Sequence, residues 1–289
     1  MKPSPRLQDF ALGIFRLVRW PNLLMIAISQ YMARIFLIGP RVDWYFILQE
    51  NDLFLISLST VLIAAAGYVI NDYFDIKIDL INKPRRVIIG RYLKRRWAIT
   101  LHQILNVVGC LVALWVSKWV FVLSVVCATL LWFYASYFKK RPFIGNVIVA
   151  LLTAFSLIIL SVYYEKGRLL VLIYALFVFT ISLVREIIKD IEDLRGDVSH
   201  GCRTLPIVWG VRATKKVIYA LIAVFIPTLF VVAQWLQNTH LAWVFMALTL
   251  LIGWLVYRLV YADTKKEFGV LSSLCKLIML LGMLSMIWV

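Results

Sequence analysis

The sequence predicts an all-α, multi-pass membrane protein, and three observations support this fold class. Hydrophobic residues make up 63% of the 289 residues, the mean hydropathy is +0.88, and apolar stretches recur along the whole chain. A soluble domain of this size would not expose so much apolar surface. A helix of about 20 apolar residues crosses roughly 30 Å of hydrocarbon, so each stretch is long enough to span a bilayer.

Nine apolar stretches predict nine transmembrane helices. In chain order they are Leu17–Ile38, Leu53–Ile70, Trp97–Val116, Trp119–Phe138, Phe143–Tyr163, Leu169–Ile188, Val217–Leu236, Leu241–Tyr261 and Val270–Val289. Polar, basic or turn-forming segments end each stretch, namely 39–52, 71–96, 117–118, 139–142, 164–168, 189–216, 237–240 and 262–269. None of these connections is long enough to link separate soluble domains. We therefore expect a single membrane domain over residues 1–289.

The basic residues predict the orientation of these helices. Most of the 31 Lys and Arg residues lie in the N-terminal segment and in the second, fourth, sixth and eighth connections. The alternate connections carry only Arg41, Lys118, Lys166 and Arg168. By the positive-inside rule, the N-terminus is cytoplasmic and the ninth crossing leaves the C-terminus outside. The net charge of +16 therefore serves topology and contact with anionic membrane lipids, and we expect no nucleic-acid partner.

The cysteines and histidines indicate neither a disulfide scaffold nor a zinc site. The four cysteines are scattered without a CxxC pair, and the three histidines show no ligand spacing.

Eight of the fifteen acidic residues gather in two short clusters. Both clusters contain the pattern Asp-x2-Asp-x3-Asp: the first is Asp72, Asp75 and Asp79, and the second is Asp190, Asp193 and Asp197. The two copies are offset by 118 positions, and the same offset carries Arg85 onto Arg203. At helical spacing, each copy presents three carboxylates on one face. Like charges at a membrane helix end repel each other, so the clusters predict a cationic partner.

Mg²⁺ is the cofactor that fits these residues. It prefers oxygen ligands, takes one or two carboxylates from the protein, and completes its shell with water and substrate phosphate. Asn71 lies four residues before Asp75, which adds an amide oxygen to the same helical face. The two clusters are therefore expected to hold a diphosphate between them through Mg²⁺. The basic residues predicted to neutralise the remaining charge are Arg85, Lys139, Arg185, Lys189 and Arg203.

The two motifs resemble those of the UbiA family of intramembrane prenyltransferases. The first aspartate-rich motif of that family is similar to NDYFDIKID at 71–79, followed by NKPRR at 82–86. The second is similar to KDIEDLRGD at 189–197, followed by GCRTLP at 201–206. Tyr134 and Lys139 resemble the family's Tyr and Lys on and after the fourth helix, and Gly145-Asn146 resembles the start of its fifth. The resemblance covers nearly the whole chain.

The resemblance implies both a fold and a reaction. It implies nine helices around a central cavity, with an isoprenyl diphosphate donor bound through Mg²⁺ and its prenyl tail in a lipid-open tunnel. The metal ligands that it implies are Asn71, Asp75 and Asp79 with Asp72 adjacent, and Asp190, Asp193 and Asp197. It also implies that Asp75, Asp193, Lys139 and Tyr134 are catalytic, that Asn146 lies at the substrate, and that Lys139 and Arg85 stabilise the departing diphosphate.

The acceptor is predicted less directly than the donor. The residue pattern of the second motif and of segment 134–140 most resembles the ether-lipid branch of the family. This resemblance implies geranylgeranyl diphosphate as donor and geranylgeranylglyceryl phosphate as acceptor. It also implies a prokaryotic cell membrane as location. Arginines near the second motif suit a phosphate on the acceptor. An aromatic acceptor, as in quinone biosynthesis, is the nearest alternative.

Two other classes of membrane protein use intramembrane or metal-binding carboxylates. A cation-coupled transporter would carry acidic residues near the bilayer midplane on broken helices, whereas both clusters here fall at the predicted cytoplasmic ends of helices. A CDP-alcohol phosphotransferase needs a DGxxAR arrangement, which this sequence lacks. The sequence therefore favours the prenyltransferase over both.

Overall fold

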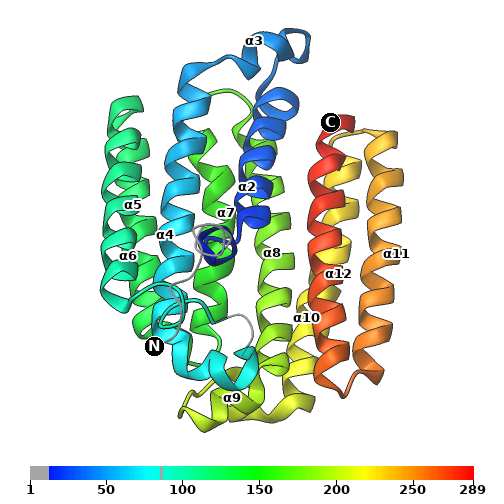
Figure 1. Cartoon of the computed structure of the whole chain (residues 1–289). Coiled ribbons are helices and arrows are strands. Elements are labelled where there is room, and N and C mark those ends of the chain that lie inside the picture. The colour runs from blue at the N-terminus through cyan, green and yellow to red at the C-terminus, as the bar shows by residue number, and fades with distance from the viewer. Residues whose placement is uncertain (1–12, 85–86) are drawn as a thin grey trace. The chain divides into compact units, whose positions relative to one another are not determined.

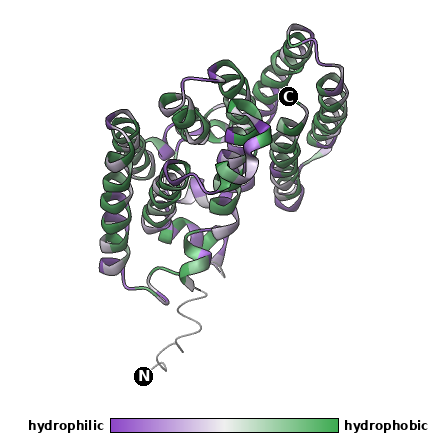
Figure 2. Cartoon of the chain, turned by 90° about the horizontal axis from the view of Figure 1, so that it is seen from above, coloured by the Kyte–Doolittle hydropathy of each residue, from purple (hydrophilic) through white to green (hydrophobic). Residues whose placement is uncertain are grey.

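The computed structural model describes residues 13–84 and 87–289, and helices make up most of this part of the chain (Figure 1). Nine helices within it are long and apolar enough to cross a membrane: Trp20–Ile38, Asn51–Asn82, Arg95–Val116, Lys118–Ser136, Ile144–Tyr163, Arg168–Glu192, Leu205–Trp235, Thr239–Tyr261 and Lys265–Trp288. Figure 2 shows that hydrophobic residues cover most of their length. The predicted fold class, an all-α multi-pass membrane protein, is confirmed.

The chain divides into two compact units, residues 1–30 with 49–138 and residues 31–48 with 139–289. The first unit contains most of α2 (Trp20–Ala33), then α4 (Asn51–Asn82), α5 (Arg95–Val116) and α6 (Lys118–Ser136). The second contains the π-helix η1 (Arg34–Ile38), the 3-10 helix η2 (Arg41–Asp43), α3 (Trp44–Leu48), most of η4 (Phe138–Lys140), α7 (Ile144–Tyr163), α8 (Arg168–Glu192), α9 (Leu194–Ser199), α10 (Leu205–Trp235), α11 (Thr239–Tyr261), α12 (Lys265–Leu284) and η5 (Ser285–Trp288).

In the first unit, α4, α5 and α6 pack against one another in all three pairs. Small residues let α4 and α5 approach closely, because a Cβ on Gly109 would lie 2.9 Å from Cγ1 of Ile63 and 3.3 Å from the carbonyl oxygen of Ser59. Buried Ser59 and Ser124 also pair their hydroxyls at 3.4 Å between α4 and α6. The unit thus presents α4 as the central helix, in contact with both others.

In the second unit, α8 is the central helix and packs against α7, α10 and α12. A continuous buried core of apolar side chains joins these helices and α11. At one close approach, a Cβ on Gly282 of α12 would overlap the ring of Phe177 on α8. Each unit therefore carries one acidic motif on or beside its central helix.

Two helices are longer than the hydropathy of the sequence predicts. The second helix was predicted at Leu53–Ile70, but α4 continues for twelve further residues through the first acidic motif. The seventh was predicted at Val217–Leu236, but α10 begins at Leu205 and is interrupted where Gly210 has φ 79°. Hydropathy marks the part of a helix that lipid surrounds, whereas backbone hydrogen bonds continue into polar segments.

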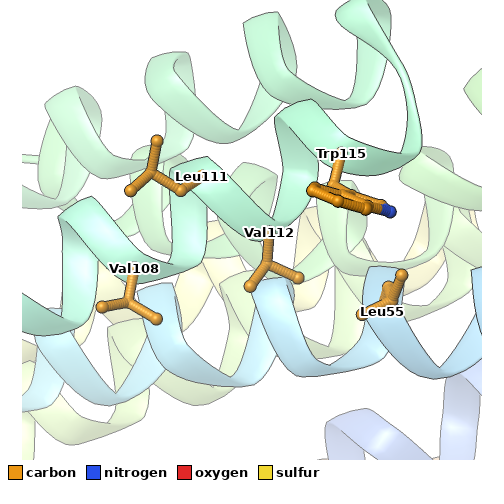
Figure 3. A pocket seen from close by; sticks show the side chains of 5 residues that line it. All are labelled: Leu55, Val108, Leu111, Val112 and Trp115. Atoms are coloured by element: carbon orange, nitrogen blue, oxygen red, sulfur yellow. The ribbon is translucent and has the colours of Figure 1, made fainter.

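The first unit also carries an apolar groove between α4 and α5. Figure 3 shows its lining side chains, which are Leu55, Val108, Leu111, Val112 and Trp115. Leu55 precedes Asn71 by sixteen residues on the same helix, which at 1.5 Å per residue places the groove about 24 Å from the acidic motif. Its five lining side chains are apolar and include no carboxylate, so it does not supply the acidic groups of the predicted site.

Candidate active site

The first acidic motif lies on one uninterrupted helix. Asn71, Asp72, Asp75 and Asp79 all belong to α4, as the spacing predicted. The amide Nδ2 of Asn71 donates a hydrogen bond of 2.9 Å to Oδ2 of Asp75. Asp75 is only 4% exposed. The helix therefore brings an amide and a buried carboxylate together, one turn apart on the same face.

Asp72 has a basic partner that the sequence did not indicate. Nη2 of Arg19 donates to Oδ1 of Asp72 at 2.8 Å, and the guanidinium carbon lies 4.8 Å from the ring centroid of Tyr68. Asn22, whose Nδ2 donates to the hydroxyl of Tyr68 at 3.3 Å, belongs to the same group. Arg19 lies in the first apolar stretch, where nothing in the local pattern distinguishes it from a residue that sets topology.

The second motif is divided between two helices, which corrects the prediction of three carboxylates on one helical face. Helix α8 ends at Glu192, Asp193 has φ −95° and ψ 6°, and Asp197 lies in the short helix α9. The backbone N–H of Asp197 still donates to the carbonyl of Asp193 at 3.2 Å. Asp190 and Asp197 therefore belong to different helices, and Asp193 lies at the junction.

The chain turns immediately after the second motif, at a glycine. Gly196 is buried inside α9, whereas Gly201 has φ 67°, a conformation that residues with a Cβ avoid. The N–H of Cys202 then donates to the carbonyl of Asp197 at 3.0 Å. The turn at Gly201 therefore folds the chain back onto the backbone of Asp197, the last residue of the motif.

Asn146 contacts the second motif directly. Its Nδ2 donates to Oδ2 of Asp190 at 2.8 Å, which joins the start of α7 to the end of α8. Asn146 is 6% exposed. The structure thus places this predicted site residue beside a predicted metal ligand.

Arg185 and Lys189 were predicted to contact the substrate, and both pair with Glu186. The carboxylate of Glu186 accepts from Nη1 of Arg185 at 2.5 Å and from Nζ of Lys189 at 3.3 Å. Glu186 is buried. Glu186, one turn before Asp190, thereby restrains the side chains of both cations, and substrate contact by Arg185 and Lys189 stays a prediction.

Helix α12 also reaches the second motif, which the sequence did not indicate. Nζ of Lys265, at the start of α12, lies 4.0 Å from Oδ1 of Asp193. A Cβ on Gly269, one turn later, would lie 3.6 Å from the carboxylate of Glu192. The start of α12 therefore brings a positive charge beside the junction between α8 and α9.

The remaining predicted residues are placed as follows. Tyr134 lies on α6 in the first unit, and Lys139 lies in η4 in the second, each partly buried. Arg203 has an exposed side chain, and its backbone N–H donates to the carbonyl of Lys140 at 2.9 Å. Arg85 lies outside the described residues.

The donor set of each motif fits Mg²⁺. The atoms available are carboxylate and amide oxygens, the ligands that Mg²⁺ prefers. Among residues 13–84 and 87–289, no three His, Cys, Asp or Glu side chains gather closely enough to hold a metal on their own. Mg²⁺ takes one or two carboxylates from a protein and completes its shell with water and substrate phosphate.

The fold and these motifs define a class of protein, a multi-pass membrane protein with an aspartate-rich motif in each of two units. Comparison with known families is decisive: the UbiA prenyltransferase family model matches residues 31–279. The chain therefore belongs to the UbiA family, and it is an integral membrane prenyltransferase. This identification sets aside the cation-coupled transporter.

Individual relatives agree with the family model. The digeranylgeranylglyceryl phosphate synthase of Sulfurisphaera tokodaii is 33% identical over 219 residues, 75% of this chain and 77% of that protein. The synthase of the same name from Korarchaeum cryptofilum is 32% identical over 245 residues, 82% of this chain and 85% of that protein. A solved UbiA homologue from Archaeoglobus fulgidus, bound to DMAPP and Mg²⁺, has a TM-score of 0.70 at 16% identity, covering 95% of this chain and 99% of that one.

Proposed function

We propose that this enzyme transfers a geranylgeranyl group from geranylgeranyl diphosphate to geranylgeranylglyceryl phosphate. The observation that carries the proposal is the series of relatives named digeranylgeranylglyceryl phosphate synthase, such as one from Methanoregula boonei that is 34% identical over 80% of both chains. In the reaction, the bond between C1 of the donor and its diphosphate oxygen breaks. C1 then bonds to the acceptor's hydroxyl oxygen, and diphosphate and a proton are released.

The two motifs are proposed to bind the donor diphosphate through Mg²⁺. The proposed ligands are Asn71, Asp75 and Asp79 in the first unit and Asp190, Asp193 and Asp197 in the second. When bound, Mg²⁺ neutralises the negative charge that builds up on the departing diphosphate. The solved A. fulgidus homologues bound to DMAPP or GPP with Mg²⁺ support this assignment by fold.

The protein's own contribution is to position the donor and to supply positive charge. Lys139 and Arg85 are proposed to contact the diphosphate, and Tyr134 to lie at the reacting carbon. Asn146 holds the carboxylate of Asp190 in one orientation through its 2.8 Å hydrogen bond. Fixed charges of this kind stabilise a leaving group without reorganising during the reaction.

A phosphate on the acceptor suits the basic residues near the second motif. Arg203 is exposed and follows Asp197 closely in the chain, while Lys265 lies 4.0 Å from Asp193. Both belong to the second unit. A guanidinium and an ammonium group together suit a phosphate, which carries up to two negative charges, whereas an aromatic acceptor such as 4-hydroxybenzoate offers a single carboxylate. We therefore favour the phosphorylated lipid acceptor over a quinone precursor.

The distribution of the basic residues supports a proposal for the orientation. We propose that the N-terminus and both motifs face the cytoplasm of a prokaryotic cell, with the prenyl tail of the donor in the lipid. The whole chain is proposed to act as one catalytic domain, because the family match spans residues of both compact units.

A direct assay tests the proposal. Purified protein in lipid nanodiscs is incubated with geranylgeranyl diphosphate, Mg²⁺ and one acceptor at a time, and products are identified by mass spectrometry. The acceptors are geranylgeranylglyceryl phosphate, its dephosphorylated alcohol and 4-hydroxybenzoate. We expect product with the phosphorylated lipid alone and none after chelation of Mg²⁺. Product with 4-hydroxybenzoate only would overturn the acceptor assignment.

A further inference from the structure

We infer that Arg19 is a positioning residue, which holds Asp72 out of the metal-binding set and fixes the turn of α4 that carries Asn71 and Asp75. The inference rests on the proposed function, in which that turn binds the donor diphosphate. It assigns Asp72, which the sequence placed among the metal ligands, to a different task.

The first support is the contact itself. Nη2 of Arg19 lies 2.8 Å from Oδ1 of Asp72, and the guanidinium also lies over the ring of Tyr68 at 4.8 Å. Tyr68 and Asp72 are one helical turn apart on α4, so their side chains share one face. Arg19 therefore contacts two consecutive turns of α4, and the second contact orients the planar group for the first.

The second support is that Arg19 immediately precedes α2 and caps its first turn. Its carbonyl oxygen accepts from the N–H of Asn22 at 2.8 Å and from that of Leu23 at 3.4 Å. The side chain of Asn22 returns to the hydroxyl of Tyr68 at 3.3 Å. Backbone and side-chain contacts thus tie the start of α2 to the same two turns of α4. A change in either helix would be transmitted through this group to the motif.

The third support is backbone conformation. Arg19 has φ 54°, in the left-handed region that residues with a Cβ rarely adopt. Such a conformation persists where surrounding contacts hold it, and it often marks a functional site. Phe143, three residues before Asn146, is another non-glycine residue with positive φ. In both units, a turn of this kind delivers a side chain to an acidic motif.

The charge balance explains what the contact achieves. Asp72, Asp75 and Asp79 place three negative charges within two turns of one helix. Arg19 neutralises Asp72, whose side chain is 19% exposed, so two carboxylates and the amide of Asn71 remain for the cation. The side chain of Asp72 is directed to Arg19, while Asn71 pairs with Asp75. The motif is thereby divided into one structural and three ligand positions.

A double-mutant cycle tests the inference with Arg19→Met, Asp72→Asn and the combined variant. Arg19→Lys retains the charge, and Arg16→Met removes an exposed arginine three residues away as a matched control. For each variant we would measure the melting temperature without Mg²⁺, its increase on adding Mg²⁺ with inorganic pyrophosphate, and, in the prenyl transfer assay, kcat and the Mg²⁺ concentration for half-maximal rate.

A positioning role predicts coupled effects. Each single variant should lower kcat by about 10-fold or more, as loss of a supporting contact to ligand residues does, and the double variant should be no worse than the more damaged single one. The Mg²⁺ requirement should change by about the same factor in Arg19→Met and in Asp72→Asn, because both variants break the same supporting contact and neither removes a ligand. Arg19→Lys should recover part of the rate, and Arg16→Met should match the unmodified enzyme.

Two results would overturn the inference. One is a rise of about 10-fold or more in the Mg²⁺ requirement of Asp72→Asn with Arg19→Met unaffected, since that is the behaviour of a metal ligand. The other is additive loss of melting temperature in the cycle, which would show that the two residues act separately. Absence of prenyl transfer by the unmodified enzyme counts against the proposed function alone, because the melting and pyrophosphate measurements need no turnover.

Discussion

The side chain of Asn146 donates a 2.8 Å hydrogen bond to Asp190, although 44 positions separate the two residues. A similar pair exists in the first motif, where Asn71 donates to Asp75 at 2.9 Å on a single helix. The 118-residue offset between the motifs carries Asn71 onto Lys189, so the second motif has no asparagine at that position. Helix α7 supplies it instead. Each motif therefore contains an amide that holds a carboxylate, from the same helix in one unit and from a neighbouring helix in the other.

This relationship predicts the effect of changing Asn146. Asn146→Ala should lower kcat/KM by about 10-fold to 100-fold, because partners that orient metal ligands typically have effects of this size. Asn146→Asp should be more damaging, since it places a second negative charge beside Asp190. The prenyl transfer assay measures both, and circular dichroism confirms that each variant is folded. Asn51→Ala, at an exposed position of α4, is the control. Full activity of Asn146→Ala would show that the contact has no part in the reaction.

The second prediction concerns Glu186, which pairs with both Arg185 and Lys189 in the second unit. Glu186→Ala leaves two cations beside the core without their carboxylate. Breaking a buried ion pair in this way should lower the free energy of unfolding by about 3 kcal/mol. We expect a lower melting temperature in detergent and lower expression. Arg185→Met combined with Glu186→Met removes both charges of the closer pair, and it should be more stable than Glu186→Ala alone. A double variant as unstable as the single one would contradict this explanation.

The third prediction separates two adjacent lysines that look alike in the sequence. Lys215 is 9% exposed, and its Nζ donates to the carbonyls of Ala262 at 2.7 Å and Val260 at 3.3 Å, at the end of α11. Lys216 is exposed. Lys215→Met leaves those carbonyls without their donor and should lower the free energy of unfolding by about 1 to 3 kcal/mol. Lys216→Met should change the free energy of unfolding by less than about 0.5 kcal/mol. Thermal unfolding of the two variants checks this, and equal effects would refute the capping role of Lys215.

These lysines illustrate what the sequence predicts and what it does not. Hydropathy and spacing predicted the helices and located both acidic motifs, because long apolar stretches and repeated carboxylates are local patterns. Lys215 and Lys216 have the same local sequence pattern. Their difference in burial depends on contacts with the end of α11, more than 40 residues later. Burial of one lysine therefore could not be predicted from its neighbours in sequence.

The same reasoning applies within the site. Asn146 was identified by family resemblance, and the structure shows its contact with Asp190. Arg19 was missed, because its partners Tyr68 and Asp72 lie about 50 positions away and its own surroundings resemble any basic helix start. The break between α8 and α9 was also missed, since the spacing of Asp190, Asp193 and Asp197 is equally compatible with one continuous helix.

The last prediction concerns the metal. Asp75→Asn and Asp193→Asn each replace a charged oxygen by an amide of nearly equal size, one in each unit, so packing is preserved while charge is lost. Each should reduce kcat by on the order of 100-fold or more, because the charge on the leaving diphosphate is no longer balanced. The Mg²⁺ concentration for half-maximal rate should rise in both variants. Asp43→Asn, which removes an exposed carboxylate outside both motifs, is the control.

Metal titration then distinguishes a ligand role from a structural one. If Asp75 and Asp193 bind Mg²⁺, adding Mg²⁺ with inorganic pyrophosphate should raise the melting temperature of the unmodified enzyme and of Asp43→Asn, and raise it less in the two motif variants. Chelation should abolish that increase in every protein. Mn²⁺ accepts the same oxygen ligands, so adding it after chelation should restore part of the activity of the unmodified enzyme. An unchanged increase in both motif variants would show that the two carboxylates do not bind the metal, since a lost ligand must weaken the complex that stabilises the fold.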